Sequence, residues 1–238
     1  KIWNAYRLIR GWEVSADIQQ SEHSKLAAEW FDNKLSQTIE TIDEHFSKFR
    51  LSDALMTLYK FFWDDFCAWY LEVIKPEYGK PIDKVTYDTT IVFFEKLLRL
   101  PHPIMPFITE ELWQNIEERK DGETIMLQPQ PKAAPYSVET IHAFEQGVGA
   151  IASVRNIRQS KGLSPKEALT LQIKGAFPEK IVSVVKRMAN LSEVSLVSEI
   201  DNSVNGAAFM VDTIEFFVPL TGMVNAEEEI AKMEAEIA

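Results

Sequence analysis

The chain has 238 residues, with 36 acidic and 25 basic side chains and a formal net charge of −11. This acidic balance argues against a protein that coats nucleic acid through bulk electrostatic attraction, although it allows RNA to be bound at one local patch. The one cysteine, Cys67, excludes disulfide bonds within the chain and cysteine-rich metal sites. No apolar run approaches the ~20 residues that span a bilayer, so we expect a cytoplasmic protein with no membrane partner.

Apolar residues at three- and four-residue spacing predict five helices in the first half of the chain. The helices are expected over residues 1–12, 25–49, 52–75, 85–99 and 106–120. Ser52 is expected to cap the third helix, and Pro106 suits the first turn of the fifth, where no amide donor is needed. Residues 15–24 and 76–83 are expected to form loops. The pattern predicts a mainly α protein with a helical bundle over residues 1–135.

The second half changes character and predicts a small α/β domain over residues 136–224. Two helices and four strands are expected, over residues 138–161, 169–174, 178–190, 194–197, 207–211 and 214–218. We expect a mainly antiparallel sheet. Asn225 and Glu228 then form a capping box, and an apolar seam predicts the beginning of a coiled-coil arm over residues 225–238. Because Lys1 and Ala238 both fall inside helical patterns, we expect a piece of a longer polypeptide.

Charge is distributed unevenly along the second half. Residues 151–200 carry eight Lys and Arg against four Asp and Glu, whereas residues 201–238 carry one against eight. An anionic partner is therefore expected to approach the first of these segments, or the exposed face of the N-terminal helix.

The chain shows no motif typical of a catalytic centre. It has no phosphate-binding glycine loop, no His-Glu-x-x-His pair and no dinucleotide fingerprint. His102 lies between two prolines and is expected to form a hydrogen bond within that corner. Asp64-Asp65 and Glu110-Glu111 are adjacent on helices and point about 100° apart, so they do not form acid–base pairs. We predict no catalytic residue and no metal site.

Residues 61–72 are unusually aromatic. At helical spacing, Phe62, Phe66, Trp69 and Tyr70 share one face. Rings of this size bury much apolar area, which favours core packing over a platform for stacking nucleobases.

Five segments, taken in chain order, resemble one family. The segments are Lys1–Leu8, Trp63–Pro76, His102–Trp113, Ser153–Arg158 and Pro219–Asn225. Together they resemble the C-terminal part of the valyl-tRNA synthetases, which are class I aminoacyl-tRNA synthetases. The proline corner at residues 101–106 is shared with the isoleucyl and leucyl relatives, whereas the Trp3-Asn4-Ala5 opening favours valyl.

Two positions depart from the family pattern. Ala28-Glu29 precedes Trp30 where the family has an Asp-Arg pair, which puts one cationic RNA contact in doubt. Ala68 stands where an aspartate is usual.

The resemblance implies an anticodon-binding helical bundle over residues 1–135, followed by the small α/β domain and the coiled-coil arm. The parent enzymes ligate valine to its tRNA with ATP and Mg²⁺, through His-Ile-Gly-His and Lys-Met-Ser-Lys-Ser motifs. Neither motif occurs in this chain. The resemblance thus implies a monomeric tRNA-binding part that is inactive by itself and holds no cofactor.

The same resemblance suggests which side chains would contact tRNA. Anticodon loops offer unstacked bases to aromatic rings and phosphates to cations. The candidates comprise one stacking ring, three contacts from the first helices and three members of a basic edge: Trp30, Asn4, Arg7, Lys34, Arg155, Arg158 and Lys161. Each has an ordinary alternative, namely a core tryptophan, surface or capping residues, and salt bridges to the acidic helical bundle.

Two rival interpretations remain open. The chain could be the corresponding domain of an isoleucyl or leucyl relative, or a helical protein-interaction module with no RNA role, which the acidic charge would suit.

Overall fold

The computed structural model describes residues 1–200 and 204–220, which divide into two compact units. The first unit is Lys1–Ile141, and the second begins at His142. The mainly α fold expected from the sequence is confirmed, and the predicted coiled-coil segment at 225–238 lies outside the described residues.

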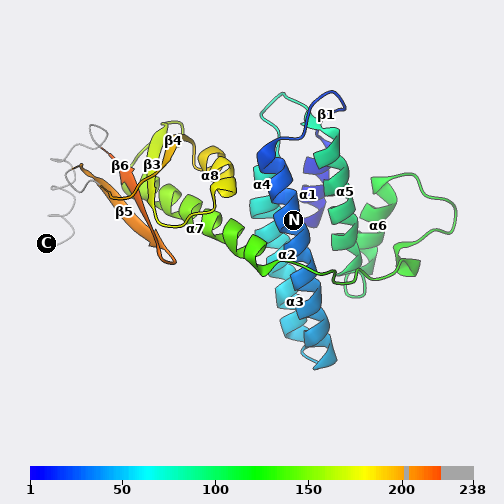
Figure 1. Ribbon diagram of the computed structural model, residues 1–238. Helices are drawn as coiled ribbons and strands as arrows, with labels where there is room; N and C mark the ends of the chain where they lie inside the picture. Colours follow the sequence, from blue (N-terminus) through cyan, green and yellow to red (C-terminus); the bar gives the residue numbers. More distant parts are fainter. Residues whose placement is uncertain (201–203, 221–238) are drawn as a thin grey trace, which may run out of the picture. The chain divides into compact units, whose positions relative to one another are not determined.

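The first unit is built from helices (Figure 1). They are α1 (Ile2–Arg10), α2 (Glu22–Ser47), α3 (Leu51–Lys60), α4 (Leu71–Ile74), α5 (Lys84–Arg99) and α6 (Pro106–Ile116). A π-helical segment, Phe61–Tyr70, joins α3 to α4, and a 3₁₀ turn, Ile125–Leu127, follows α6. Helices α2 and α3 lie side by side as an antiparallel hairpin, whose turn projects at the lower end of Figure 1.

Side-chain caps define where two of these helices begin. The Ser21 hydroxyl accepts a hydrogen bond from the Ser24 amide at 3.3 Å, so α2 starts at Glu22, earlier than the apolar pattern suggests. The Asp83 carboxylate caps α5 in the same way, at 2.8 Å from the Thr86 amide. The prediction that Ser52 caps the third helix is wrong. Helix α3 begins at Leu51, directly after the tight turn that ends α2, so Ser52 is already inside it.

The core of the first unit is aromatic and centres on Phe31 of α2. Its ring is fully buried and packs on Phe61, Phe66, Tyr70 and Phe93, at centroid distances of 5.0, 5.4, 4.8 and 5.1 Å. Offset and edge-on contacts of this kind stabilise a core beyond the apolar area that they bury. For the buried rings of the aromatic segment, the prediction of core packing rather than a stacking platform agrees with this burial.

The π-helical segment changes which aromatic residues share a face. The buried members are Phe61, Phe62, Phe66 and Tyr70, whereas Trp69 is only half-buried. Phe61 and Phe66 are five residues apart, which is the hydrogen-bonding interval of a π-helix rather than of an α-helix. The prediction from α-helical spacing therefore omitted Phe61 and wrongly placed Trp69 on the buried face.

A two-residue strand pair links the two loops expected at 15–24 and 76–83. Strand β1 (Val14–Ser15) pairs in parallel with β2 (Ile82–Asp83). Strands this short leave no periodic pattern in the sequence, so this pair was not predicted.

The second unit packs helices on a four-stranded sheet. Its elements are α7 (Val138–Ser160, which begins just before the unit boundary), β3 (Leu169–Lys174), the 3₁₀ turn Glu179–Ile181, α8 (Val182–Met188), β4 (Leu191–Leu196), β5 (Gly206–Val211) and β6 (Ile214–Pro219). The strand order is β4-β3-β6-β5. The β3–β6 and β5–β6 pairs are antiparallel, as expected for most of the sheet, whereas β3 and β4 are parallel and are connected through α8.

Two glycines let α7 approach its neighbours closely. A Cβ at Gly147 would lie 2.4 Å from Cγ2 of Ile181, and one at Gly149 would lie 2.8 Å from Cγ1 of Val211. Both distances are shorter than atoms tolerate, so larger residues at these positions would push the helix away.

Candidate functional site

The predicted contact residues of the first two helices lie at the surface. Asn4 and Arg7 are exposed on α1, and Lys34 is half-buried on α2. Helix α1 packs through Tyr6, whose ring stacks on Phe94 of α5 at 6.3 Å and whose hydroxyl donates to the Asn115 carbonyl of α6 at 2.9 Å. The tRNA contacts predicted for Asn4, Arg7 and Lys34 therefore remain predictions.

The structure contradicts the predicted stacking role of Trp30. Its side chain is only 1% exposed and packs edge-on against Phe31 at 5.9 Å. A base can stack only on a ring whose face is accessible, so Trp30 serves the core, as its alternative interpretation held.

Arg158 is also corrected, because it is buried within the second unit at 6% exposure. Its Nη1 donates to the carbonyls of Ser164 and Glu167 at 3.0 and 2.7 Å, and its Nη2 donates to those of Ala189 and Asn190, both at 3.0 Å. Burial lowers the pKa of this guanidinium from its usual value, and the nearby Glu167 opposes that effect. Four of its donors are thus used within the fold, and a phosphate has no access to them.

The remaining members of the predicted basic edge stay near the surface. Arg155 is exposed and donates through Nη2 to the Met188 carbonyl at 3.1 Å, while Lys161 is half-buried just after α7. The edge therefore loses its central cation, Arg158.

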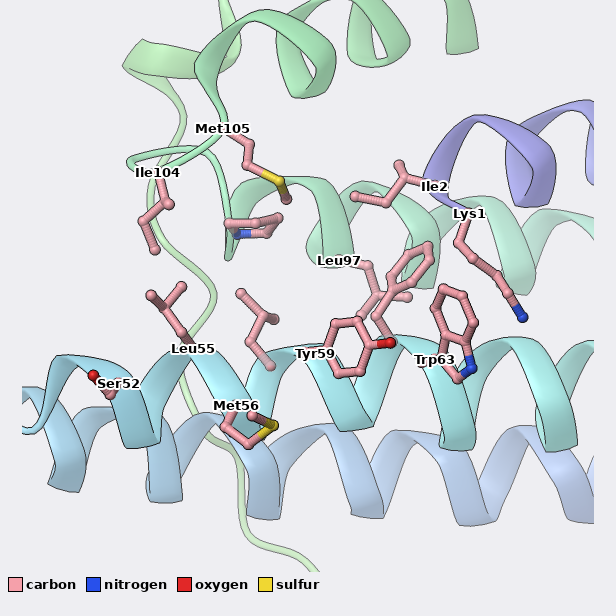
Figure 2. A pocket seen from close by; sticks show the side chains of 13 residues that line it. Lys1, Ile2, Ser52, Leu55, Met56, Tyr59, Trp63, Leu97, Ile104 and Met105 are labelled. Atoms are coloured by element: carbon pink, nitrogen blue, oxygen red, sulfur yellow. The ribbon is translucent and has the colours of Figure 1, made fainter.

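The structure reveals a feature that the sequence analysis missed, an apolar groove of about 570 Å³ in the first unit. We call it the α3 groove (Figure 2). It is lined by Lys1, Ile2, Ser52, Leu55, Met56, Leu58, Tyr59, Phe62, Trp63, Leu97, Pro101, Ile104 and Met105. None of these lining residues is acidic, although the chain as a whole has a net charge of −11.

One end of the α3 groove combines stacked rings with a cation. Tyr59 and Trp63 stack at 5.5 Å with an interplanar angle of 21°, and the Lys1 ammonium lies 3.6 Å from the centre of the Trp63 ring. Figure 2 shows both rings on the helix that faces Lys1. Tyr59 is 55% exposed, so its face is accessible to a ligand.

The proline corner forms the opposite wall of the groove. Ile104 and Met105 are half-exposed there, and Figure 2 shows them above the α3 side chains. The corner is held by His102, whose Nδ1 lies 2.7 Å from the Thr109 hydroxyl, as expected for a hydrogen bond within this segment. The same hydroxyl contacts the Met105 carbonyl at 2.8 Å, which ties the corner to the start of α6.

The sequence contained a signal for this groove. Leu51, Leu55, Tyr59 and Trp63 recur at four-residue intervals, which places them along one face of a helix. This face is separate from the apolar stripe of the same helix that packs against α2. A helix with two apolar faces suggests a second contact surface.

Glu110 of α6 has a structural role in the first unit. The Glu110 carboxylate accepts hydrogen bonds from the Thr124 hydroxyl, the Gln114 amide and the Ile125 backbone, at 2.6, 2.7 and 3.1 Å. Burial raises the pKa of Glu110, but these hydrogen bonds outweigh burial, and the net pKa is lowered. Glu110 thus anchors the turn after α6.

Among residues 1–200 and 204–220, no group of three His, Cys, Asp or Glu side chains is placed to hold a metal ion. Within the same ranges, none of the helices has both the length and the apolar character needed to cross a membrane.

Comparison with known proteins places the chain in a family. The family model described as the anticodon-binding domain of tRNA ligase matches residues 28–173, which is more than half of the chain. The chain belongs to this family. The match covers α2 through β3, and so includes the helix that carries Tyr59 and Trp63 in this anticodon-binding domain.

Curated relatives match the chain along all of its length. The chain is 48% identical to the valine–tRNA ligase of Parabacteroides distasonis, 47% to that of Phocaeicola vulgatus and 46% to that of Bacteroides thetaiotaomicron. Each comparison covers 100% of this chain and 27% of the relative. The chain therefore spans about a quarter of the length of these ligases.

Proposed function

We propose that this chain is the anticodon-binding part of a valine–tRNA ligase and that it binds the anticodon region of valine-accepting tRNA. The observation that carries the proposal is the similarity of this whole chain to one part of the valine–tRNA ligases, together with the family match over residues 28–173. The similarity favours a valyl enzyme over an isoleucyl or leucyl relative, and the family favours RNA binding over a protein-interaction module.

The α3 groove supports this proposal on physical grounds. Unstacked bases of an RNA loop bind proteins through aromatic stacking and apolar contact, with cations at the phosphates. The groove offers Tyr59 and Trp63 as rings, Lys1 as a cation and no carboxylate among its lining residues. We propose that it holds an unstacked base of the anticodon loop.

The proposal assigns tRNA binding to this chain and catalysis to other regions of a longer enzyme. No catalytic constellation was predicted from the sequence, so valine activation with ATP and Mg²⁺ is assigned to regions that the relatives have beyond this part. The chain itself is proposed to be an inactive, monomeric and cytoplasmic tRNA-binding module that holds no cofactor.

A fluorescence-anisotropy titration tests the proposal. The chain is titrated into labelled tRNA with anticodon GAC, and into the same tRNA with the middle anticodon base changed. Because hydrogen bonds to base edges discriminate against the wrong base by about 1–3 kcal/mol, we expect the base change to weaken binding by about tenfold or more. Equal and weak binding to both tRNAs would contradict anticodon recognition.

Tyr59→Ala in the same assay tests the groove. We expect binding to weaken several-fold, because one stacking face is lost. Tyr78→Ala is the matched control, since Tyr78 is a fully exposed tyrosine of the same unit outside the groove. Equal affinities for the two variants would remove the groove from the interface.

A further inference from the structure

The turn between α2 and α3, residues 48–50, holds an aromatic residue in a left-handed backbone conformation. The Arg50 amide donates to the His45 carbonyl at 2.9 Å, and the Phe49 amide donates to the Phe46 carbonyl at 3.0 Å. This pair of bonds is a common helix ending in which the left-handed residue is usually glycine, because a Cβ is crowded there. Phe49 occupies that position with φ of 56°, so it carries backbone strain that glycine would avoid.

Packing does not explain why a phenylalanine stands at this position. The Phe49 side chain is 90% exposed, so its ring contributes little to the core of the first unit. A strained and exposed aromatic residue is costly to the folded state, and strained residues of this kind cluster at functional sites. Phe49 is therefore better suited to contacting a partner than to supporting the fold.

The charges on the turn indicate the chemistry of that partner. Lys48 and Arg50 flank Phe49 directly, and both are exposed. Lys48 forms an ion pair with Glu44 on α2, and its hydrogen bond lowers the pKa of that carboxyl. Glu44 also lies within electrostatic reach of Arg50, but its ion pair and hydrogen bond are with Lys48, so Arg50 is the principal cation for a phosphate. A ring between cations suits a base and its neighbouring phosphates, and suits an apolar protein surface less well.

The turn is also continuous with the α3 groove. An apolar face runs from Leu51 through Leu55 and Tyr59 on α3 to the half-buried Trp63 at the start of the π-helical segment, a distance of about 18 Å along the helix. Leu55, Tyr59 and Trp63 line the groove, and Figure 2 shows them in a row along the helix toward Lys1. A strand of RNA that enters the groove can therefore follow this face to the turn.

We propose that the α2–α3 turn is a second RNA contact, in which an unpaired base stacks on Phe49 while Arg50 and Lys48 contact the adjacent phosphates. The inference rests on the proposed function, because the same RNA would occupy the α3 groove. It adds a contact at the opposite end of α3 from Lys1 and implies that the two contacts bind successive parts of one strand.

The test is Phe49→Gly, measured with labelled tRNA of anticodon GAC. Glycine removes the ring and relieves the strained φ, so we expect the thermal midpoint to stay unchanged or rise while tRNA binding weakens about tenfold. Phe107→Ala is the matched control, because Phe107 is also 90% exposed on the first unit and does not line the groove. We expect this control to bind as the wild type does, and Phe49→Trp to keep wild-type affinity.

The outcomes separate the inference from the proposed function. If the wild-type chain binds no tRNA, the proposed function fails and the inference fails with it. If the wild type binds and Phe49→Gly binds equally well, the function stands and the turn is not an RNA contact. Equal weakening in Phe49→Gly and Phe107→Ala would also overturn the inference, since it would show a general apolar effect.

Discussion

At the scale of single residues, the decisive property is whether a side chain is accessible. Trp30 and Arg158 were both predicted to contact RNA, and both are buried, at 1% and 6% exposure. A sequence shows that a residue has a ring or a guanidinium, but not which neighbours from distant segments enclose it. The four carbonyls bound by Arg158 come from two loops later in the chain. The spacing of residues around Arg158 does not predict these contacts.

Arg158→Ala should destabilise the second unit by about 3 kcal/mol, because it leaves buried carbonyls without donors. Urea denaturation followed by circular dichroism measures the loss. All six tryptophans lie at or before Trp113, so tryptophan fluorescence reports on the first unit, and its transition should move less.

Arg155→Ala is the control for this prediction, since Arg155 is exposed on the same helix. We expect its free energy of unfolding to stay within about 0.5 kcal/mol of the wild-type value. Equal stability of the Arg155 and Arg158 variants would refute a structural role for Arg158.

Cys67 should react slowly with iodoacetamide at pH 8. Burial raises the pKa of its thiol to about 11, and the nearby Lys1 charge opposes this only in part. Relative to an ordinary cysteine thiol with a pKa of 9.0, this gives about a hundredfold less thiolate at that pH.

The labelling rate should increase about tenfold per pH unit until the pH approaches 11. In urea the thiol regains its ordinary pKa, so labelling should accelerate. A folded protein that is labelled at pH 8 as fast as the urea-unfolded chain would contradict the raised pKa.

At the scale of elements, the sequence was most informative where a regular period lasts over several turns. Helices α2, α5 and α7 were expected within a few residues of their observed bounds. Two kinds of element escaped prediction. The π-helical segment Phe61–Tyr70 follows a different interval, and the β1–β2 pair is too short to show any interval.

Gly147→Ala should destabilise the second unit by about 1–3 kcal/mol, although alanine favours helices more than glycine does. The new methyl group would lie 2.4 Å from the branched side chain of Ile181, which has little freedom to move away. Thermal unfolding measures the effect, with Asn156→Ala on the exposed surface of the same helix as the control. A stability gain in Gly147→Ala would show that α7 does not depend on this close approach.

At the scale of the whole molecule, the net charge disfavours RNA binding, whereas the residues that line the α3 groove favour it. A net charge of −11 opposes non-specific attraction to RNA, whereas the α3 groove contains one lysine and no acid. The net charge can be counted from the sequence, but the absence of acidic residues from the lining of the groove can be seen only in the structure. The fold class and the family were predicted from the sequence. The groove was recognised only in the structure, although the four-residue repeat from Leu51 to Trp63 is a signal for it.

The separation of the acidic charge from the groove predicts a weak dependence of tRNA binding on salt. If Lys1, Lys48 and Arg50 are the main phosphate contacts, the logarithm of the affinity should fall with the logarithm of salt concentration with a slope of about −2. Anisotropy titrations at several salt concentrations measure the slope, and Arg50→Gln should make it shallower by just under one. A slope several times steeper would indicate a broad basic surface instead.

The position of Arg158 has a consequence for how the sheet is assembled. Its four carbonyl partners lie just ahead of β3 and just ahead of β4, which are parallel neighbours. Parallel strands have no tight hairpin to set their alignment, because a crossover joins them. A side chain near the end of α7 supplies that alignment by holding both strand entries at once. We therefore expect the alignment of the pair to depend on the docking of α7, so that the helix and these two strands unfold together.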